Sequence, residues 1–279
     1  MVYAIFSTTL ERPDKLISYW TTVCGYTNMM LSEKHPHPND NNIEFQPTGH
    51  TYKVKGCPST ISVTRLVHNQ FPDFDGDAVI NGMMSRPTWP KSPYFGMTRE
   101  AIKAQWAESG AAASSQGTQL HNDIEDFYNG KEVSNDSTEY QYFLAFEEWR
   151  KQQGLIPYRA EWTVYDVPHR LAGTIDMCFQ TPEGDIAIYD WKRVKAIRRT
   201  AYEGKTGKTG ACDTVPDSNY WHYSLQLALY KYILETHYGK KVVHTSLVLL
   251  HPSYSNYELH TTNDMSDVVN ELLKTRKSS

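Results

Sequence analysis

Apolar residues in this chain recur at every second position in some segments and at every third or fourth in others. These spacings predict a mixture of strands and helices. The two-residue period is clearest in residues 171–192, where two runs of strand character flank the turn sequence Thr-Pro-Glu-Gly at 181–184. Proline at the second turn position and glycine at the fourth suit a type I turn, so the segment predicts a β-hairpin. Shorter runs predict further strands at residues 50–54, 159–165 and 242–251.

Helical spacing is clear in residues 118–130, where one apolar stripe runs from Leu120 to Tyr128. Thr118 is the expected N-cap of this helix, and Gly130 is a suitable stop. Further helices are expected at residues 14–20, 62–69, 99–108, 137–153, 221–234 and 264–277.

The length of 279 residues allows one substantial core, so we expect a single domain with an embellished N-terminal part. The chain lacks an apolar run of about 18 residues, and its N-terminus lacks a secretory or import pattern, so we expect an intracellular protein without membrane attachment. Four cysteines are scattered without C-x-x-C spacing, which argues against an iron–sulfur cluster, a zinc site and a disulfide framework.

The net charge of −4 means that any nucleic-acid binding must use a local surface. One such surface is the stretch that follows Lys192, which is rich in cations and glycine and has no apolar period. Two interpretations of this stretch are open: it binds the phosphate backbone of a nucleic acid, or it is ordinary solvated surface. Its cations are Arg193, Lys195, Arg198, Arg199, Lys205 and Lys208.

The predicted hairpin carries candidate chemistry. Alternation places Asp190 and Lys192 on one face of the second strand, and folding about the turn brings Asp176 of the first strand level with Asp190. Two adjacent carboxylates repel each other unless a cation lies between them, and oxygen ligands favour Mg²⁺ or Mn²⁺. A lysine on the same face can orient a water molecule and offset charge on a phosphorus centre. The alternative is an ordinary surface ion pair.

Asp176 and the sequence Asp190-Trp191-Lys192 resemble the acidic and D-x-K elements of the PD-(D/E)XK nuclease superfamily. Two further segments resemble its RecB-type branch: Gly-Thr-x-Leu-His-x-x-Ile-Glu at 117–125, and Gln226-x-x-x-Tyr230. The resemblance covers roughly residues 50–255 and implies an α/β core with a mixed central sheet and flanking helices. In this reading residues 115–279 form the nuclease core, and residues 1–114 form an N-terminal embellishment of helices and loops.

The resemblance also implies roles for individual residues. It implies that His121, Asp176, Asp190 and the Trp191 carbonyl hold Mg²⁺ or Mn²⁺, and that Lys192 positions the attacking water. Glu161 corresponds to a glutamate at the edge of the active site, although an ordinary strand-face glutamate is an equal alternative. The other roles are supporting ones for Thr118 and Glu125, and for Gln226 and Tyr230 both buttressing of the site and contacts to DNA near the scissile phosphate.

Residues 62–64 and 71–75 are similar to the mitochondrial genome maintenance exonuclease group and its viral relatives. The expected function is therefore a metal-dependent DNA exonuclease that prefers single-stranded ends, in repair, recombination or replication. Two alternatives are a structure-specific endonuclease of the same superfamily and a nucleic-acid-binding module without cleavage. Tyr94, Trp221 and Tyr223 are the candidate rings for stacking unpaired bases.

Overall fold

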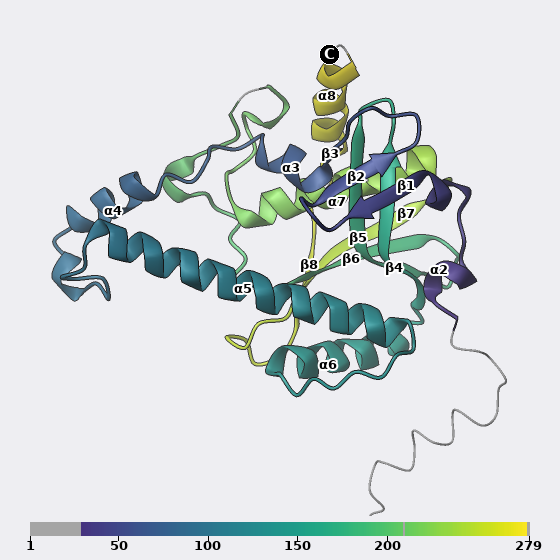
Figure 1. Cartoon of the computed structure of the whole chain (residues 1–279), viewed down its shortest axis with the longest axis horizontal. Helices are drawn as coiled ribbons and strands as arrows, with labels where there is room; N and C mark the ends of the chain where they lie inside the picture. The colour runs from purple at the N-terminus through teal and green to yellow at the C-terminus, as the bar shows by residue number, and fades with distance from the viewer. Residues whose placement is uncertain (1–28, 209, 278–279) are drawn as a thin grey trace, which may run out of the picture.

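The computed structural model describes residues 29–208 and 210–277, so the helix expected at 14–20 lies outside the described residues. A six-stranded mixed sheet forms the centre, with helices on both sides (Figure 1). The expected mixed α/β architecture is therefore confirmed. The strands of this sheet are β3 (Ile61–Ser62), β4 (Ile156–Asp166), β5 (Leu171–Gln180), β6 (Ile186–Lys192), β7 (Val242–Leu249) and β8 (Glu258–Thr261).

The predicted hairpin forms from β5 and β6. The two strands are antiparallel, with Met177 opposite Tyr189. The Gly184 N–H donates to the Thr181 carbonyl over 2.9 Å, which is the hydrogen bond expected for the predicted turn. β4 is antiparallel to β5, β7 is parallel to β6, and β8 is antiparallel to β7.

One edge of β5 changes partner along its length. β4 pairs with β5 from end to end, so β6 and β3 must share the other edge. β6 pairs with residues 177–180, and β3 pairs in parallel with residues 171–172. β5 and β6 therefore separate beyond Met177, and Asp176 lies where they part.

The two faces of the sheet pack against different helices. One face packs on α3 (Val63–His68), α7 (Asn219–His237) and α8 (Ser266–Lys277), and the opposite face on α5 (Arg99–Tyr128) and α6 (Thr138–Gln152). Successive β6 residues alternate between the two cores, as the two-residue period predicted. Ser62 and Ser137 cap α3 and α6 through their side chains, which fixes where these helices begin.

α5 differs from the sequence prediction. Helices expected at 99–108 and 118–130 are one continuous helix of 30 residues, about 45 Å long. Thr118 is therefore an exposed interior residue and not an N-cap, and the cap is Thr98. Residues 109–117 remain helical because three alanines favour the helix and no proline interrupts it, which outweighs the two glycines.

The N-terminal half of α5 projects from the body (Figure 1). Residues 107–116 are all exposed, and α4 (Gly76–Met84) packs near the start of α5. Ile80 and Ile102 are fully buried there. We call residues 74–117 the arm; residue 114, the expected domain boundary, lies inside it.

The N-terminal segment contains the strand expected at residues 50–54, which is β2 (Thr51–Val54), and two further strands that were not expected. β1 (Ile43–Gln46) and β2 form a two-stranded antiparallel sheet, while β3 joins the central sheet. A short helix, α2 (Leu31–Lys34), and a 3-10 turn at Pro38–Asn42 precede them. Among residues 29–208 and 210–277, no helix is both long and apolar enough to cross a membrane.

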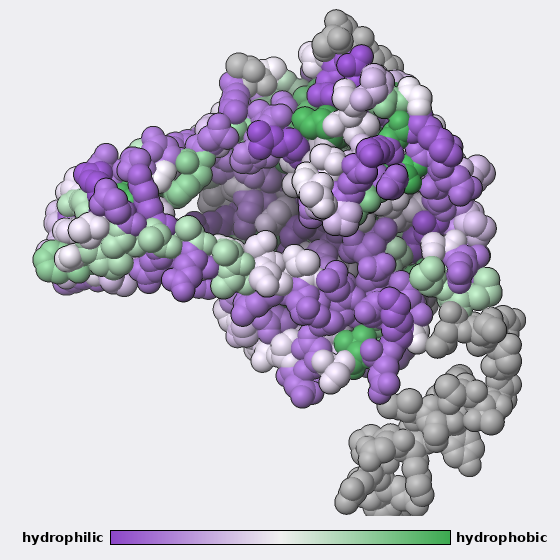
Figure 2. Space-filling view, viewed as in Figure 1, coloured by the Kyte–Doolittle hydropathy of each residue, from purple (hydrophilic) through white to green (hydrophobic). Residues whose placement is uncertain are grey.

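A hollow separates the arm from the body (Figure 2). The segment after β6, residues 193–208 and 210–218, contacts both the arm and the body on either side of the hollow. The Arg86 guanidinium on the arm side donates to the Tyr202 hydroxyl over 2.8 Å, and the Lys208 N–H donates to the Gln70 carbonyl over 2.8 Å. These contacts link the arm to the segment after β6.

Candidate metal centre

The hairpin places two carboxylates and a lysine together. The Trp191 N–H donates to Asp176 Oδ2 over 2.9 Å, so the side chain of Asp176 bridges the point where the strands part. Asp190 is buried, and Lys192 Nζ lies 2.5 Å from its Oδ2. The cluster predicted from alternation is therefore present in the fold.

His121 approaches this cluster from α5. Its Nδ1 lies 3.6 Å from Glu161 Oε1 and 3.6 Å from Asp176 Oδ2. Its Nε2 lies 3.0 Å from the Trp191 carbonyl oxygen. His121, Glu161 and Asp176 offer ligand atoms that all lie within 4.8 Å of one another. Glu161 was expected at the edge of the active site, and the structure places it directly beside His121 and Asp176.

Glu161 has an unusual backbone conformation. Its neighbours Ala160 and Trp162 pair with Met177 and Ile175, so Glu161 lies level with Asp176 on the adjacent strand. Its φ is +44°, in a region that non-glycine residues enter at a cost of about 1–3 kcal/mol. The surrounding sheet therefore holds a strained residue at this site.

The charges of the cluster shift one another's pKa. Burial and the Asp176 charge raise the pKa of Asp190 to about 6, against the opposing effect of Lys192. Burial also raises the pKa of Asp176, although the cations of His121 and Lys192 oppose this. Burial lowers the pKa of His121, but Asp176 and Glu161 outweigh it and bring that pKa to about 9. His121 is therefore a cation at neutral pH, and its Nε2–H donates to the Trp191 carbonyl.

The donor set fits a divalent cation. Both Asp190 carboxylate oxygens are buried: Lys192 Nζ lies 2.5 Å from Oδ2 and compensates its charge, whereas Oδ1 accepts no hydrogen bond from the described residues. A buried carboxylate oxygen without such a partner is costly, and a cation beside it would offset that cost. The ligand atoms that lie within 4.8 Å of one another belong to His121, Glu161 and Asp176, and Asp190 lies outside that group. A cation would also replace the proton of His121, since a ligating imidazole must be neutral.

Tyr230 and Gln226 lie on α7 beside the carboxylates. The side chains of Gln226 and Tyr230 share a hydrogen bond, and the charges of Asp176 and Asp190 contribute to raising the pKa of Tyr230, after burial. Tyr230 is only 2% exposed and offers little surface to a DNA strand. This placement favours a buttress role over direct DNA contact for Tyr230.

Gly173 is required by the position of Tyr230. A Cβ atom added to Gly173 would lie 2.7 Å from Tyr230 Cε1 and 2.8 Å from its hydroxyl oxygen. Only glycine allows the ring to lie this close to β5.

Two further tyrosines join the site. The Tyr52 hydroxyl of β2 lies 3.0 Å from Thr174 Oγ1, and Lys192 Nζ lies 4.8 Å from the centre of the Tyr223 ring. Tyr223 was expected only as a base-stacking ring. Nothing in the sequence indicated Tyr52, because its contact spans 122 residues.

The expected DNA-binding cations occupy different surroundings. Arg193 Nε donates to Glu139 Oε1 over 2.8 Å, and its side chain is 14% exposed, so an internal ion pair occupies this group. Lys195, Arg198 and Arg199 are exposed, and the Arg199 guanidinium lies 3.8 Å from the Tyr220 ring centre.

Glu125 lies one turn beyond His121 on α5. Burial raises its pKa, and its charged neighbours are Lys131 and Asp126. Glu125 therefore has local electrostatic partners at the end of the helix, and the structure does not bring it into the carboxylate cluster.

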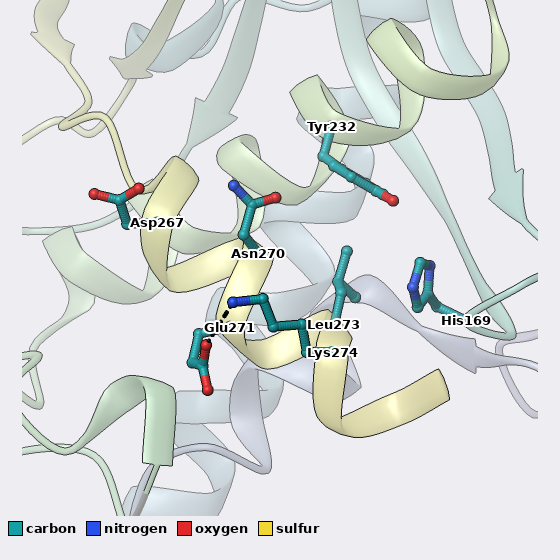
Figure 3. Close-up of a pocket in the computed structure, with 7 residues that line it drawn as sticks. All are labelled: His169, Tyr232, Asp267, Asn270, Glu271, Leu273 and Lys274. Carbon is teal, nitrogen blue, oxygen red and sulfur yellow. Dashed lines mark hydrogen bonds and ion pairs between the residues drawn. The ribbon is translucent and has the colours of Figure 1, made fainter. Parts of the chain in front are cut away.

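A pocket of about 610 Å³ lies beside α8 and includes none of the candidate site residues (Figure 3). Four of its lining residues, Asp267, Asn270, Glu271 and Lys274, recur along α8 at helical spacing. Lys274 and Glu271 form an exposed ion pair of 3.1 Å. The carboxylates and lysine of the hairpin, and not this pocket, identify the candidate site.

Comparisons with known proteins do not assign a family. No protein-family model matches the chain, and no curated protein matches it. A solved structure titled "Crystal structure of SSO0001" shares 14% identity at a TM-score of 0.28, over 79% of this chain and 77% of that one. A likeness at this level does not assign fold or function.

Proposed function

We propose that this protein is a divalent-metal-dependent deoxyribonuclease with a PD-(D/E)XK core of the RecB type. The observation that carries the proposal is the meeting of Asp176, Asp190 and Lys192 where β5 and β6 separate. Asp190 Oδ1 is buried there and accepts no hydrogen bond from the described residues, which is a situation that a bound cation would relieve.

His121, Asp176, Asp190 and Glu161 would hold the cation, with the Trp191 carbonyl as a further oxygen ligand. A bound Mg²⁺ or Mn²⁺ supplies neutralisation of phosphate charge and a more acidic water molecule. These are hard cations that prefer carboxylate and carbonyl oxygens, which form most of this set.

Lys192 would act on the substrate directly. Asp190 and Asp176 raise its pKa against the opposing effect of burial, so it stays an ammonium at neutral pH. An ammonium beside the carboxylates can donate to the attacking water and to a phosphate oxygen, where negative charge grows in the transition state. The Tyr223 ring and the Asp190 carboxylate fix the position of Lys192.

The preferred substrate in this proposal is single-stranded DNA with a free end. The arm and the segment after β6 border the hollow seen in Figure 2, and the Arg86–Tyr202 contact links them. Exposed cations on that segment favour phosphates, and an unpaired strand enters a confined space without the unstacking cost that paired bases carry.

The test compares equal nucleotide concentrations of linear single-stranded, circular single-stranded and blunt duplex DNA, with Mn²⁺ or Mg²⁺, on denaturing gels. We expect rapid loss of the linear single strand, slow loss of duplex, and little loss of circles. Asp176→Asn should abolish cleavage, while the exposed Asp136→Asn should retain it. Equal rates on linear and circular strands would instead indicate the endonuclease alternative.

The absence of metal-dependent cleavage from all three substrates would contradict the nuclease proposal. If the same protein still bound DNA, the remaining alternative would be a binding module. The acid–acid–lysine set disfavours that alternative, because DNA binding alone does not require buried carboxylates beside phosphate.

A further inference from the structure

The arm carries a cluster of aromatic rings that folding alone does not explain. Phe74 contacts Trp106 with 5.9 Å between ring centres, and Tyr94 contacts the same indole at 6.0 Å. Trp89 and Phe95 form a second pair at 6.0 Å. Phe74 is nevertheless 74% exposed and Phe95 57% exposed. Exposed rings contribute little burial to stability, so their place on a projecting arm points to a binding surface.

The cluster is held in a fixed arrangement. Trp106 Nε1 donates to the Tyr94 hydroxyl over 3.0 Å, which ties the connection after α4 to α5. That connection contains Pro87, Pro90 and Pro93, whose rings restrict the backbone. Rings that are already ordered lose little conformational entropy when a ligand stacks on them.

The charges around the rings favour a polyanion. Two acids on the arm are engaged locally, because Asp77 pairs with Lys103 at 2.6 Å and Asp75 caps α4 through the Ala78 N–H, whereas Glu100 and Glu108 are exposed. Exposed cations lie on the arm and on the segment that the Arg86–Tyr202 contact joins to it. They are Arg86, Lys91, Arg99, Lys195, Arg198, Arg199, Lys205 and Lys208.

We propose that Phe74 and Phe95 form a platform on which bases of single-stranded DNA stack while that strand also occupies the candidate metal centre. This inference rests on the proposed nuclease function and adds a second, remote contact to it. Aromatic rings bind unpaired bases of any sequence, and interspersed cations bind the phosphates between them. A protein-docking surface would instead have a centre depleted of charge.

The distance between the two sites gives the proposal a length signature. Trp106, behind Phe74, and His121 of the metal centre lie 15 residues apart on α5, which corresponds to about 22 Å along the helix. A stacked single strand advances about 3.4 Å per nucleotide, so roughly seven nucleotides separate the two contacts. A stacked strand of five nucleotides, about 17 Å long, does not span the two sites, whereas one of 25 does.

The experiment measures binding by fluorescence anisotropy in an Asp176→Asn background with Mn²⁺, using end-labelled oligothymidylates of 5 and 25 nucleotides. We expect Phe74→Ala with Phe95→Ala to weaken binding of the 25-mer about fivefold to hundredfold, the range found for lost base stacking. Binding of the 5-mer should change less than about twofold. Tryptophan at both positions should restore the affinity for the 25-mer, whereas leucine should not, since leucine has no face for stacking.

Ile156→Ser is the matched control, because Ile156 is an exposed apolar residue of β4, 55% exposed and outside the arm. Unchanged 25-mer affinity in the double alanine variant would overturn the platform, as would full rescue by leucine. Cleavage by the unsubstituted protein is measured in parallel. Cleavage with an unaffected double variant refutes only the platform, whereas length-dependent binding without cleavage refutes only the nuclease.

Discussion

Substituting Gly173 with alanine tests the packing that positions Tyr230 behind the candidate metal centre. The added Cβ would lie 2.7 Å from Tyr230 Cε1 and 2.8 Å from the hydroxyl oxygen, both below contact distance. Carbon atoms pack at about 3.5–4.0 Å, so the ring must move by about 1 Å. Tyr230 is 2% exposed within a packed core, so the ring has little room to move.

The expected cost follows from this geometry. Overpacking of a filled core destabilises a protein by about 1–3 kcal/mol. For a chain of this size each kcal/mol lowers the melting temperature by about 2–4 °C, so Gly173→Ala should lower it by about 2–12 °C. A shift of about 1 Å in a group that supports the carboxylates of the proposed nuclease site should lower kcat about 100-fold.

The assay combines thermal unfolding with single-strand degradation, and α5 provides the matched control. Gly110 is an exposed helical glycine with open space at its Cβ position, so Gly110→Ala should stabilise the protein by about 0.5–1 kcal/mol. The same substitution should therefore have opposite signs at the two positions. If Gly173→Ala melts and cleaves like the unsubstituted protein, Tyr230 does not lie over β5 as described.

Three further predictions concern charge. Lys192→Ala should lower kcat by about 100-fold or more and change the DNA dissociation constant far less, because its charge acts in the transition state; kinetics equal to those of the unsubstituted protein would exclude this role. Titration calorimetry should detect Mn²⁺ binding that Asp176→Asn with Asp190→Asn abolishes and that weakens from pH 7 to pH 5, since protons compete at the carboxyl with a pKa of about 6. Burial raises the pKa of Asp166, but hydrogen bonds from His237 and His169 outweigh burial and lower that pKa overall. The free energy of unfolding lost in Asp166→Asn, measured with urea, should therefore be full above about pH 4 and shrink as the pH falls further. A loss that is independent of pH would contradict this linkage.

The local pattern of the sequence was sufficient for most elements and for the centre of the site. Alternation in residues 171–192 predicted the β5–β6 hairpin and placed Asp176 level with Asp190, because side chains on paired strands alternate with a fixed period. Apolar stripes and capping residues likewise predicted α3, α6, α7 and α8, since these signals act within a few residues.

Tertiary structure decided what depends on distant parts of the chain. The helix that carries His121 is continuous with the arm, although two separate helices were expected, because terminal packing at both ends and the alanines between them sustain it. The internal ion pair of Arg193 with Glu139 joins residues 54 positions apart, so a local charge pattern could not distinguish Arg193 from its exposed neighbours.

The surroundings of the carboxylates also depend on tertiary contacts. Glu161, with its strained backbone, lies beside Asp176 because β4 pairs with β5. Tyr52 reaches Thr174 because β2 lies against β5. Burial then sets the charge states there and raises the pKa of Asp190 to about 6, which a sequence pattern alone does not encode. Residue spacing thus placed the carboxylates on the hairpin, whereas long-range packing determined which groups surround them and how strongly they hold a proton.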